Sequence, residues 1–515
     1  MKRYFSYIIY LVLSGLLFVS CSHDMADTLA GGDNARQYVV YAQSQADTRM
    51  ALDETTQKTF AWQAGDRLTI DGTATTSEAL TATDISSDGR SAKFTFTGTD
   101  PKGKTLVYGS TAIYGKSATA VSGSDMVYAT GVVADDYTFT MAHQAAYFKF
   151  SLLPADGTSI DHITISGKNL GTTDDRDITI AAADMGKYTA VSKDATDLNV
   201  WVGMADGQTA TLLEDKSVDG AKVITVKRTK APTMVEIWQD HFTSPTLNAQ
   251  YWNYETGIIR NEEVQWYQPA NAYTDGSEEG NLILEGRKEQ VANPSYDPSS
   301  TSWPSNMEYA KYTSGSVNTM GKMSWQYGSL EARAKIPTGS GSWPAIWTLG
   351  NNITSVGWPL CGEVDVMEYY GKYSSFLYYF LYQGGPLTAN IIWEPWQNIT
   401  QQQMVNAALS GDYSSLGSDL YLYPSGSGFK DSYHVWRMDW TESSIKLYLD
   451  DVLKNECDIT NLRNWTQTYN PFRLPHFLLL DMAMGGTWGG DVDESLLPFK
   501  YMIDYVKITQ LKYTE

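Results

Sequence analysis

Cysteine and histidine are scarce in this chain. Its 515 residues include three cysteines, Cys21, Cys361 and Cys457, and six histidines. No two cysteines have the Cys-x-x-Cys spacing and no His-Glu-x-x-His motif occurs, which argues against a thiolate zinc site and against a zinc hydrolase. We expect Cys361 and Cys457 to be buried free thiols, with a disulfide between them as the alternative.

Positive charge and long apolar runs are also in short supply. The 38 Lys and Arg residues are outnumbered by 59 Asp and Glu residues, which gives a formal net charge of -21. Such a chain repels nucleic-acid phosphates and anionic membranes, so neither is expected as a partner and a neutral ligand fits better. Beyond the N-terminus no run of 18 apolar residues occurs, so no second membrane span is expected.

The one long apolar stretch lies at the N-terminus. Two basic residues precede residues 4–19, and this stretch ends just before Cys21. A charged start, a short apolar segment and a small residue before the cut are typical of a secretory signal. A cysteine at the cleavage point resembles a bacterial lipoprotein signal, which implies that residues 1–21 are the signal, that Cys21 is lipidated and that residues 22–36 are a flexible tether. The implied location is the outer membrane or cell surface of a Gram-negative bacterium; a simple cleaved signal or a short anchor is the alternative.

The rest of the chain divides by composition into two strand-rich parts. In residues 37–230, short alternating segments separated by Gly, Asp and Ser turns predict a β-sandwich. Only two of the 16 tryptophans, Trp62 and Trp201, precede position 232. Residues 235–515 also alternate as strands do, and they predict a jelly roll. The expected fold is all-β, an N-terminal β-sandwich followed by a C-terminal β-jelly-roll (concanavalin-like) sandwich.

Two segments of the first part, Phe60–Ile70 and His143–Phe150, resemble the fimbrillin-like β-sandwich domains of Bacteroidota lipoproteins. No paired carboxylates or metal-type cluster occurs in this part. We therefore expect a spacer or docking module here, with carbohydrate binding as the alternative.

Three carboxylates gather in the segment Gly362–Tyr369. Side chains alternate between the faces of a strand, so Glu363 and Asp365 project together while Glu368 points the other way. One extra residue in a β-bulge would bring Glu368 to the shared face. Carboxylates crowded on one face repel one another, so their placement together needs an explanation. A calcium site or an exposed acidic strand is the alternative to a catalytic role.

Retaining glycoside hydrolysis supplies such a reason. It needs an ionised carboxylate as nucleophile and a protonated carboxyl as acid, roughly 5–5.5 Å apart on either side of the scissile bond. A middle carboxyl can orient one of the pair and separate the two pKa values.

Six further segments accompany the carboxylates in order: Asn261–Tyr267, Tyr327–Arg333, Gly341–Trp347, His434–Trp440, Met484–Trp488 and Asp504–Lys507. With the signature Glu-x-Asp-x-x-Glu, they make the second part resemble glycoside hydrolase family 16, the superfamily of laminarinases, lichenases, agarases and endo-β-galactosidases. The resemblance implies that Glu363 is the nucleophile, Glu368 the general acid/base and Asp365 their assistant. It also implies substrate contacts from Trp343, Trp347, Asn261, Glu263, Arg333 and Trp488, with core packing as the alternative for the first two.

The family resemblance implies no cofactor for the chemistry. It does imply a structural calcium, held by Asp504 and by the backbone carbonyl of Gly280, since calcium prefers oxygen ligands. An ordinary surface aspartate is the alternative reading of Asp504.

The expected function is endo-acting, retaining hydrolysis of a β-linked polysaccharide by a monomer. The leading substrate is β-1,3- or mixed β-1,3/1,4-glucan, and the alternative is a β-galactan, keratan-like or mucin-type glycan. Many laminarinases carry a histidine where this chain has Tyr382, which weakens the case for laminarin. Residues 386–430 are expected to be loops that shape the substrate cleft. A non-catalytic carbohydrate-binding or adhesive surface protein is the alternative of a different class.

Overall fold

The computed structural model describes residues 36–42, 61–118, 128–153, 159–171, 177–218, 223–373, 386–394, 418–424, 429–464, 466 and 469–514. The all-β prediction is confirmed, because strands make up nearly all the regular structure in these ranges. Apart from 3₁₀ turns, the described helices are α1 (Ile353–Val356) and α4 (Gly486–Gly489). None of them is long and apolar enough to cross a membrane.

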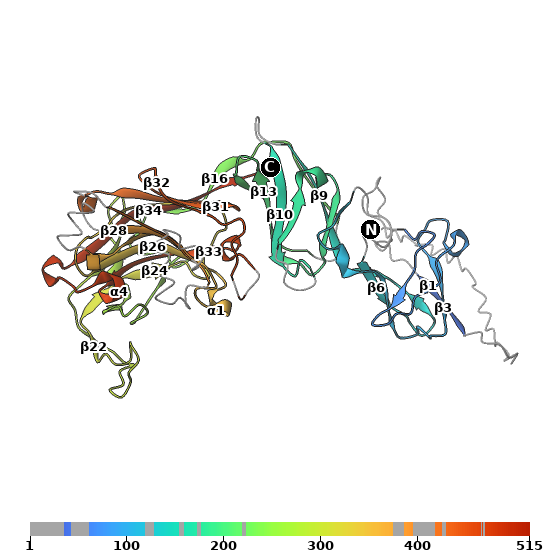
Figure 1. Ribbon diagram of the computed structural model, residues 1–515, viewed down its shortest axis with the longest axis horizontal. Helices are drawn as coiled ribbons and strands as arrows, with labels where there is room; N and C mark the ends of the chain where they lie inside the picture. Colours follow the sequence, from blue (N-terminus) through green and yellow to red (C-terminus); the bar gives the residue numbers. More distant parts are fainter. Residues whose placement is uncertain are drawn as a thin grey trace, which may run out of the picture.

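The described residues form three large hydrophobic cores in succession along the chain. The sheets around them lie in a row in Figure 1. The first core is enclosed by two small sheets and by one face of a third sheet, which it shares with the second core. In spatial order the strands of the two small sheets are β3 (Ala92–Thr97), β1 (Gln37–Ala42) and β7 (Thr138–Phe139), and β2 (Thr69–Ile70), β4 (Thr105–Gly109), β6 (Tyr128–Val132) and β8 (Ala142–His143). Burial alternates along β3, so Phe94 and Phe96 point into this core.

The second core shares a sheet with the first. That sheet has the order β15 (Val223–Arg228), β9 (Ala145–Leu152), β12 (Tyr188–Ser192) and β5 (Ser117–Ala118). Strand β9 is buried on both faces, because Tyr147 packs in the first core and Phe148 in the second. Residues 37–230, where the sequence predicts one sandwich, therefore contain two cores on either side of one sheet.

The third core, formed mainly by residues after 232, lies between two large sheets. The seven-stranded sheet has the order β17 (Asn253–Tyr254), β24 (Ser316–Asn318), β33 (His476–Met484), β26 (Ser342–Gly350), β27 (Glu363–Tyr369), β28 (Pro386–Ile392) and β29 (Ser418–Pro424). The twelve-stranded sheet follows the path β11 (Asp177–Ala181), β10 (Ile160–Lys168), β13 (Thr196–Met204), β14 (Thr209–Ser217), β34 (Phe499–Lys512), β25 (Gly328–Lys335), β30 (His434–Trp440), β31 (Ser444–Leu449) and β32 (Val452–Asp458). Three more strands complete this sheet: β16 (Thr233–Asp240) and β20 (Leu282–Gly286) pair with β34, and β19 (Ala272–Thr274) pairs with β20. Two separate two-stranded sheets are formed by β18 (Gln265–Tyr267) with β23 (Tyr312–Ser314) and by β21 (Val291–Ala292) with β22 (Tyr309–Ala310).

Strand β34 joins the second and third cores through one continuous sheet. Its central part pairs with β25, and its end, at Leu511 and Lys512, pairs in parallel with β14. Tyr513 packs in the second core, whereas Trp201 of β13 packs in the third. The ring centroid of Trp201 lies 4.8 Å from that of Tyr327. The two cores therefore exchange side chains as well as backbone hydrogen bonds.

The prediction that residues 386–430 are loops is wrong for two segments of that region. Strands β28 and β29 extend the seven-stranded sheet beyond β27. On β28, Leu387 and Ile391 pack in the core, whereas Asn390 faces the carboxylates described below. A strand buried on both faces does not show the alternation that marks a half-exposed one. Residues 395–417 and Tyr382 lie outside the described residues.

Two predictions concern cysteines and the N-terminus. Cys361 and Cys457 are both buried and form no disulfide with each other, which agrees with the expectation of two thiols. Cys21, the signal and the tether lie outside the described residues, so their assignment stays a prediction.

Candidate active site

A bulge in β27 brings three carboxyls to one face of the seven-stranded sheet. Opposite β26, Asp365 pairs with Trp347 and Glu368 pairs with Ala345, so four residues of β27 lie opposite three residues of its neighbour. The register on β28 is irregular over the same stretch. The extra residue restores Glu368 to the face of Glu363 and Asp365, as the sequence predicts. Apolar residues between them, such as Val364 and Met367, fill the core on the opposite face.

Each outer carboxylate is held by the indole N–H of a tryptophan. Trp358, in the loop after α1, donates to Glu363 Oε2 at 2.6 Å. Trp343, on β26, donates to Glu368 Oε1 at 2.9 Å. Indole nitrogen can only donate, so each tryptophan favours the ionised form of its partner and fixes its orientation.

The second oxygen of Glu368 has its own donors. The Tyr370 hydroxyl lies 2.9 Å from Oε2 and Asn390 Nδ2 lies 3.2 Å from it. The ring of Tyr370 stacks on Trp488 of α4 at 4.9 Å with an interplanar angle of 18°. Trp488 is among the exposed large side chains, at 36% relative exposure, so it offers a ring face beside the acid/base candidate on which a sugar can stack.

Burial raises the pKa of all three carboxyls, and the charges of their neighbours add to the shift. The pKa of Glu363 rises to about 7 through burial and the nearby Glu368, while a hydrogen bond from Asp365 opposes the rise. The pKa of Asp365 lies well above its ordinary value, because burial and both glutamates disfavour its charge. Burial likewise raises the pKa of Glu368, and the hydrogen bonds from Trp343 and Tyr370 oppose this. With the pKa of every member raised, the trio can hold protons instead of three negative charges, which relieves the repulsion expected of three adjacent carboxylates.

A buried charged network adjoins this trio on β33 and β18. Asp481 Oδ1 accepts from Trp347 Nε1 at 2.6 Å, and Oδ2 accepts from the Tyr267 hydroxyl at 2.9 Å. Arg260 lies over the Trp347 ring at 5.2 Å and forms an ion pair with Glu255. Trp347 therefore has its polar edge fixed by Asp481 and its ring covered on one side by a cation.

Two of the remaining residues predicted to contact substrate, Glu263 and Asn261, differ in their exposure. Glu263 is buried, accepts a hydrogen bond from Gln265 at 2.6 Å, and has a pKa raised to about 8, mainly by burial. The backbone oxygen of Asn261 accepts from the Thr487 N–H at 3.1 Å, which holds the Asn261 loop against the helix of Trp488. Both are therefore near the carboxyl trio, one beneath the surface and one on it.

Arg333 does not share the face of the carboxyls, and its predicted substrate contact is wrong. It lies on β25 of the twelve-stranded sheet, where Ala332 and Ala334 point into the core. Alternation along the strand therefore turns Arg333 outward, on the far side of the core from β27. There it pairs with Asp504 and lies 4.5 Å from the ring centre of Tyr433.

The same ion pair argues against the predicted calcium. The Asp504 carboxylate is engaged by the Arg333 guanidinium, and a cation in that place would repel a second one. Within the described residues no group of three His, Cys, Asp or Glu side chains could hold a metal. Gly280 has a positive φ of 69° and closely approaches the His241 carbonyl, so packing accounts for this glycine. The residues present do not fit the calcium site.

Sequence reasoning missed Trp358, Tyr370, Arg260 and Asp481. The first two lie within five residues of the Glu363–Glu368 segment, so nearness to the signature was an available signal. Arg260 directly precedes the segment Asn261–Tyr267 and Asp481 lies three residues before Met484. Nothing in a single sequence shows that both contact Trp347 of β26, which is far away in the chain.

Comparisons with known proteins agree on one family. Residues 286–507 match the model of glycosyl hydrolases family 16. Glucan endo-1,3-beta-glucosidase A1 of Niallia circulans is 32% identical over 289 residues, covering 53% of this chain but only 37% of that protein. The beta-glucanase of Rhodothermus marinus is 30% identical over 293 residues, covering 54% of this chain and 86% of that protein.

A third relative differs in its substrate. Keratan-sulfate endo-1,4-beta-galactosidase of Sphingobacterium multivorum is 31% identical over 327 residues, covering 62% of this chain and 65% of that protein. Among solved structures, the laminarinase catalytic domain of Thermotoga maritima MSB8 is 28% identical, covers 54% of this chain and 98% of that chain, and has a TM-score of 0.42.

A β-sandwich with three carboxyls on a bulged strand, together with the match to the family model and the glucanase of Rhodothermus marinus, defines the second part of the chain as a glycoside hydrolase domain. The chain belongs to the glycosyl hydrolases of family 16. The family prediction is thereby confirmed. The resemblance of the first part to fimbrillin-like domains stays a prediction.

Proposed function

We propose that the protein is an endo-acting, retaining β-glycanase in which Glu363 is the nucleophile and Glu368 the general acid/base. The observation that carries this is the bulged strand β27, which presents both glutamates on one face with a separate tryptophan donor for each. Membership of family 16 and the endo-acting relatives support the same reaction type.

The two carboxyls would act in two steps. Glu368, whose pKa is raised by burial, gives its proton to the departing glycosidic oxygen. Glu363 attacks the anomeric carbon and forms a covalent glycosyl-enzyme. Glu368, now ionised, takes a proton from water, which attacks the same carbon and releases Glu363. Two inversions leave the product with the starting β configuration.

Asp365 would serve Glu363 rather than the sugar. It is 2% exposed and keeps its proton, so it can donate a hydrogen bond to the nucleophile. That bond stabilises the carboxylate before attack and weakens when the charge is consumed in the ester. Asp365 is therefore a positioning residue for Glu363.

For the substrate, a β-1,3- or mixed β-1,3/1,4-glucan is the first candidate, since two of the relatives described above carry glucanase names. A β-galactosidic polymer is the second candidate. The keratan-sulfate enzyme gives a longer alignment than either of them, and Tyr382 replaces the histidine expected of many laminarinases.

A panel of polymers tests the proposal and the substrate together. The full chain would be incubated with laminarin, mixed-linkage glucan, β-galactan, keratan sulfate and mucin, and the released oligosaccharides sized. Endo action predicts a ladder of intermediate products from one polymer class. Release of only monosaccharide would contradict endo action, and no product from any polymer would contradict the hydrolase assignment.

Attachment to a membrane through Cys21 belongs to the proposal as well. A Cys21→Ala variant should move the protein from the detergent-extracted fraction to the soluble or unprocessed one. Unchanged membrane association would contradict lipidation.

A further inference from the structure

The second and third cores are held together by a buried glutamate. Glu442, in the turn between β30 and β31, accepts from His162 Nε2 at 2.7 Å and from Thr164 Oγ1 at 2.5 Å, both on β10. Its backbone N–H donates to Thr209 Oγ1 at 3.1 Å. Only 5% of Glu442 is exposed. These bonds, with the shared sheet, fix the turn against the second core.

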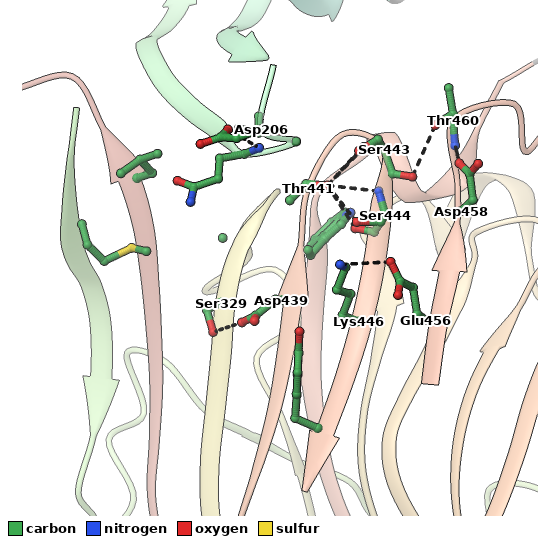
Figure 2. A pocket seen from close by; sticks show the side chains of 18 residues that line it. Asp206, Ser329, Asp439, Thr441, Ser443, Ser444, Lys446, Glu456, Asp458 and Thr460 are labelled. Carbon is green, nitrogen blue, oxygen red and sulfur yellow. Dashed lines mark hydrogen bonds and ion pairs between the residues drawn. The ribbon is translucent and has the colours of Figure 1, made fainter. Parts of the chain in front are cut away.

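A groove of about 890 Å³ runs along this junction. One wall is the β13–β14 hairpin, residues 206–209, and the other is the outward face of β30, β31 and β32. Figure 2 shows Asp206 on the first side and Ser443, Ser444 and Lys446 on the second. Because both cores contribute a wall, the groove exists only when they are joined.

Polar and apolar groups share the lining of the groove, and Met234, Trp440 and Leu511 supply apolar surface. Hydroxyls come from Ser329, Thr441, Ser443, Ser444 and Thr460, the amide from Gln208, and a phenol ring from Tyr448. Four carboxylates, those of Asp206, Asp439, Glu456 and Asp458, face one ammonium, that of Lys446, so the formal charge of the lining is −4 + 1 = −3.

That chemistry selects among ligands. A negative lining repels sulfated, phosphorylated and carboxylated molecules. The carboxylates can accept hydrogen bonds from adjacent hydroxyls, and the Gln208 amide can both donate and accept, which suits a neutral polyhydroxylated ligand. The volume lies within the roughly 300–1,000 Å³ of small-ligand sites, enough for a few sugar units.

We propose that this groove is a second glycan-binding site, which holds a neutral segment of the same polymer that the enzyme cleaves. The proposal rests on the proposed hydrolase function for the identity of that polymer. Leu330, Met438 and Leu447 alternate with the lining residues and fill the core, so the groove and the β27 carboxyls lie on opposite sides of that core. A chain bound in the groove thus leaves the reacting segment free and raises its local concentration at the enzyme.

The test uses the full chain carrying Glu363→Gln, so that the polymer stays intact. A Gln208→Ala/Glu456→Ala double variant removes one exposed polar group from each wall. The matched control is Gln63→Ala/Glu78→Ala, two exposed residues on the first core that do not line the groove. Affinity electrophoresis in gels containing neutral glucan or galactan should show the apparent dissociation constant rising roughly three- to tenfold for the groove variant and not for the control.

Two further readouts keep the outcomes distinct. The single variant Gln208→Ala removes none of the side-chain hydrogen bonds described above. It should show part of the same loss of affinity for the glycan. With Glu363 intact, the groove variant should lose more activity on long polymer than on a short aryl glycoside that cannot reach both sites. Equal retardation of groove and control variants would overturn the second site, even if the enzyme cleaves the polymer. Groove-dependent retardation only by a polymer that the enzyme with Glu363 intact does not cleave would show a glycan site but overturn the claim that it holds the cleaved polymer.

Discussion

The hydroxyl of Tyr370 lies 2.9 Å from Oε2 of Glu368 and donates a hydrogen bond to it. The bond stabilises the ionised form of Glu368 and so holds its pKa below the value that burial alone would give. Tyr370 is therefore a positioning residue for the general acid, and it also places its ring against Trp488.

A Tyr370→Phe variant should move the basic limb of the kcat/KM profile to higher pH. Without the donor, the pKa of Glu368 rises, so the acid keeps its proton further into the alkaline range. A shift of about one pH unit corresponds to the loss of one such bond. Tyr369→Phe is the matched control, because its hydroxyl accepts from the Gly339 N–H instead. A basic limb that moves equally in both variants would contradict the role of Tyr370.

The opposite limb should respond to Trp358. Its indole N–H donates to Glu363 Oε2 at 2.6 Å, which lowers the pKa of a nucleophile that burial raises to about 7. A Trp358→Phe variant removes the donor, so Glu363 should ionise only at higher pH and the acid limb of kcat/KM should move upward. The two kcat/KM profiles would be measured on one aryl glycoside. An acid limb at the same pH in the native enzyme and the variant would show that this bond does not lower the pKa of the nucleophile.

The junction between the second and third cores should be needed for the stability of the hydrolase domain. Trp201 is 2% exposed and packs on Tyr327 across that junction. Trp201→Ala should cost about 3–5 kcal/mol of unfolding free energy and lower the temperature at which activity is lost. Trp62→Ala empties a similar space in the first core and is the control. Equal thermal inactivation of both variants would contradict a special role for the junction.

The His162–Glu442 pair should make that stability depend on pH. The hydrogen bond to Glu442 is the main reason that the pKa of His162 rises from 6.5 to about 9. A raised pKa contributes stability that is complete below about pH 6.5 and is lost as the pH rises through 9. The melting temperature should therefore fall across this window more steeply in the native protein than in Glu442→Gln. Parallel curves would show that the pair does not couple to unfolding.

The local sequence pattern predicts the three carboxyls of the active site better than it predicts how distant segments are arranged around them. The alternation of Glu363 and Asp365, and the bulge that recovers Glu368, follow from the geometry of a single strand. Arg333 was misplaced because a family motif does not reveal which face of a sandwich a residue occupies. Leu330, Ala332 and Ala334 are all buried, and only this register shows that Arg333 points away from the carboxyls.

The boundary between the two parts of the chain also shows that a sequence pattern does not reveal contacts between distant residues. Composition changes near residue 232, which predicts a boundary between two strand-rich parts there. In the structure, Trp201 fills part of the third core and Tyr513 part of the second. Contacts between residues so far apart in the sequence cannot be predicted from the local pattern. The same is true of the sharing of β9 between two cores.

The division of labour between the two glutamates is the central claim, and azide rescue tests it most directly. Glu368→Ala should lose polymer cleavage by several orders of magnitude, because the departing oxygen needs a proton. On an aryl glycoside with a good leaving group the first step should survive. Added azide, which needs no base, should then restore turnover and yield the β-glycosyl azide. Glu363→Ala should show no such product. If azide rescues Glu363→Ala at all, it displaces the aryl group directly with one inversion, so the product should be the α-glycosyl azide. A β-azide from Glu363→Ala together with an α-azide from Glu368→Ala would mean that the two roles are exchanged, and full activity of either variant without azide would place the active site elsewhere.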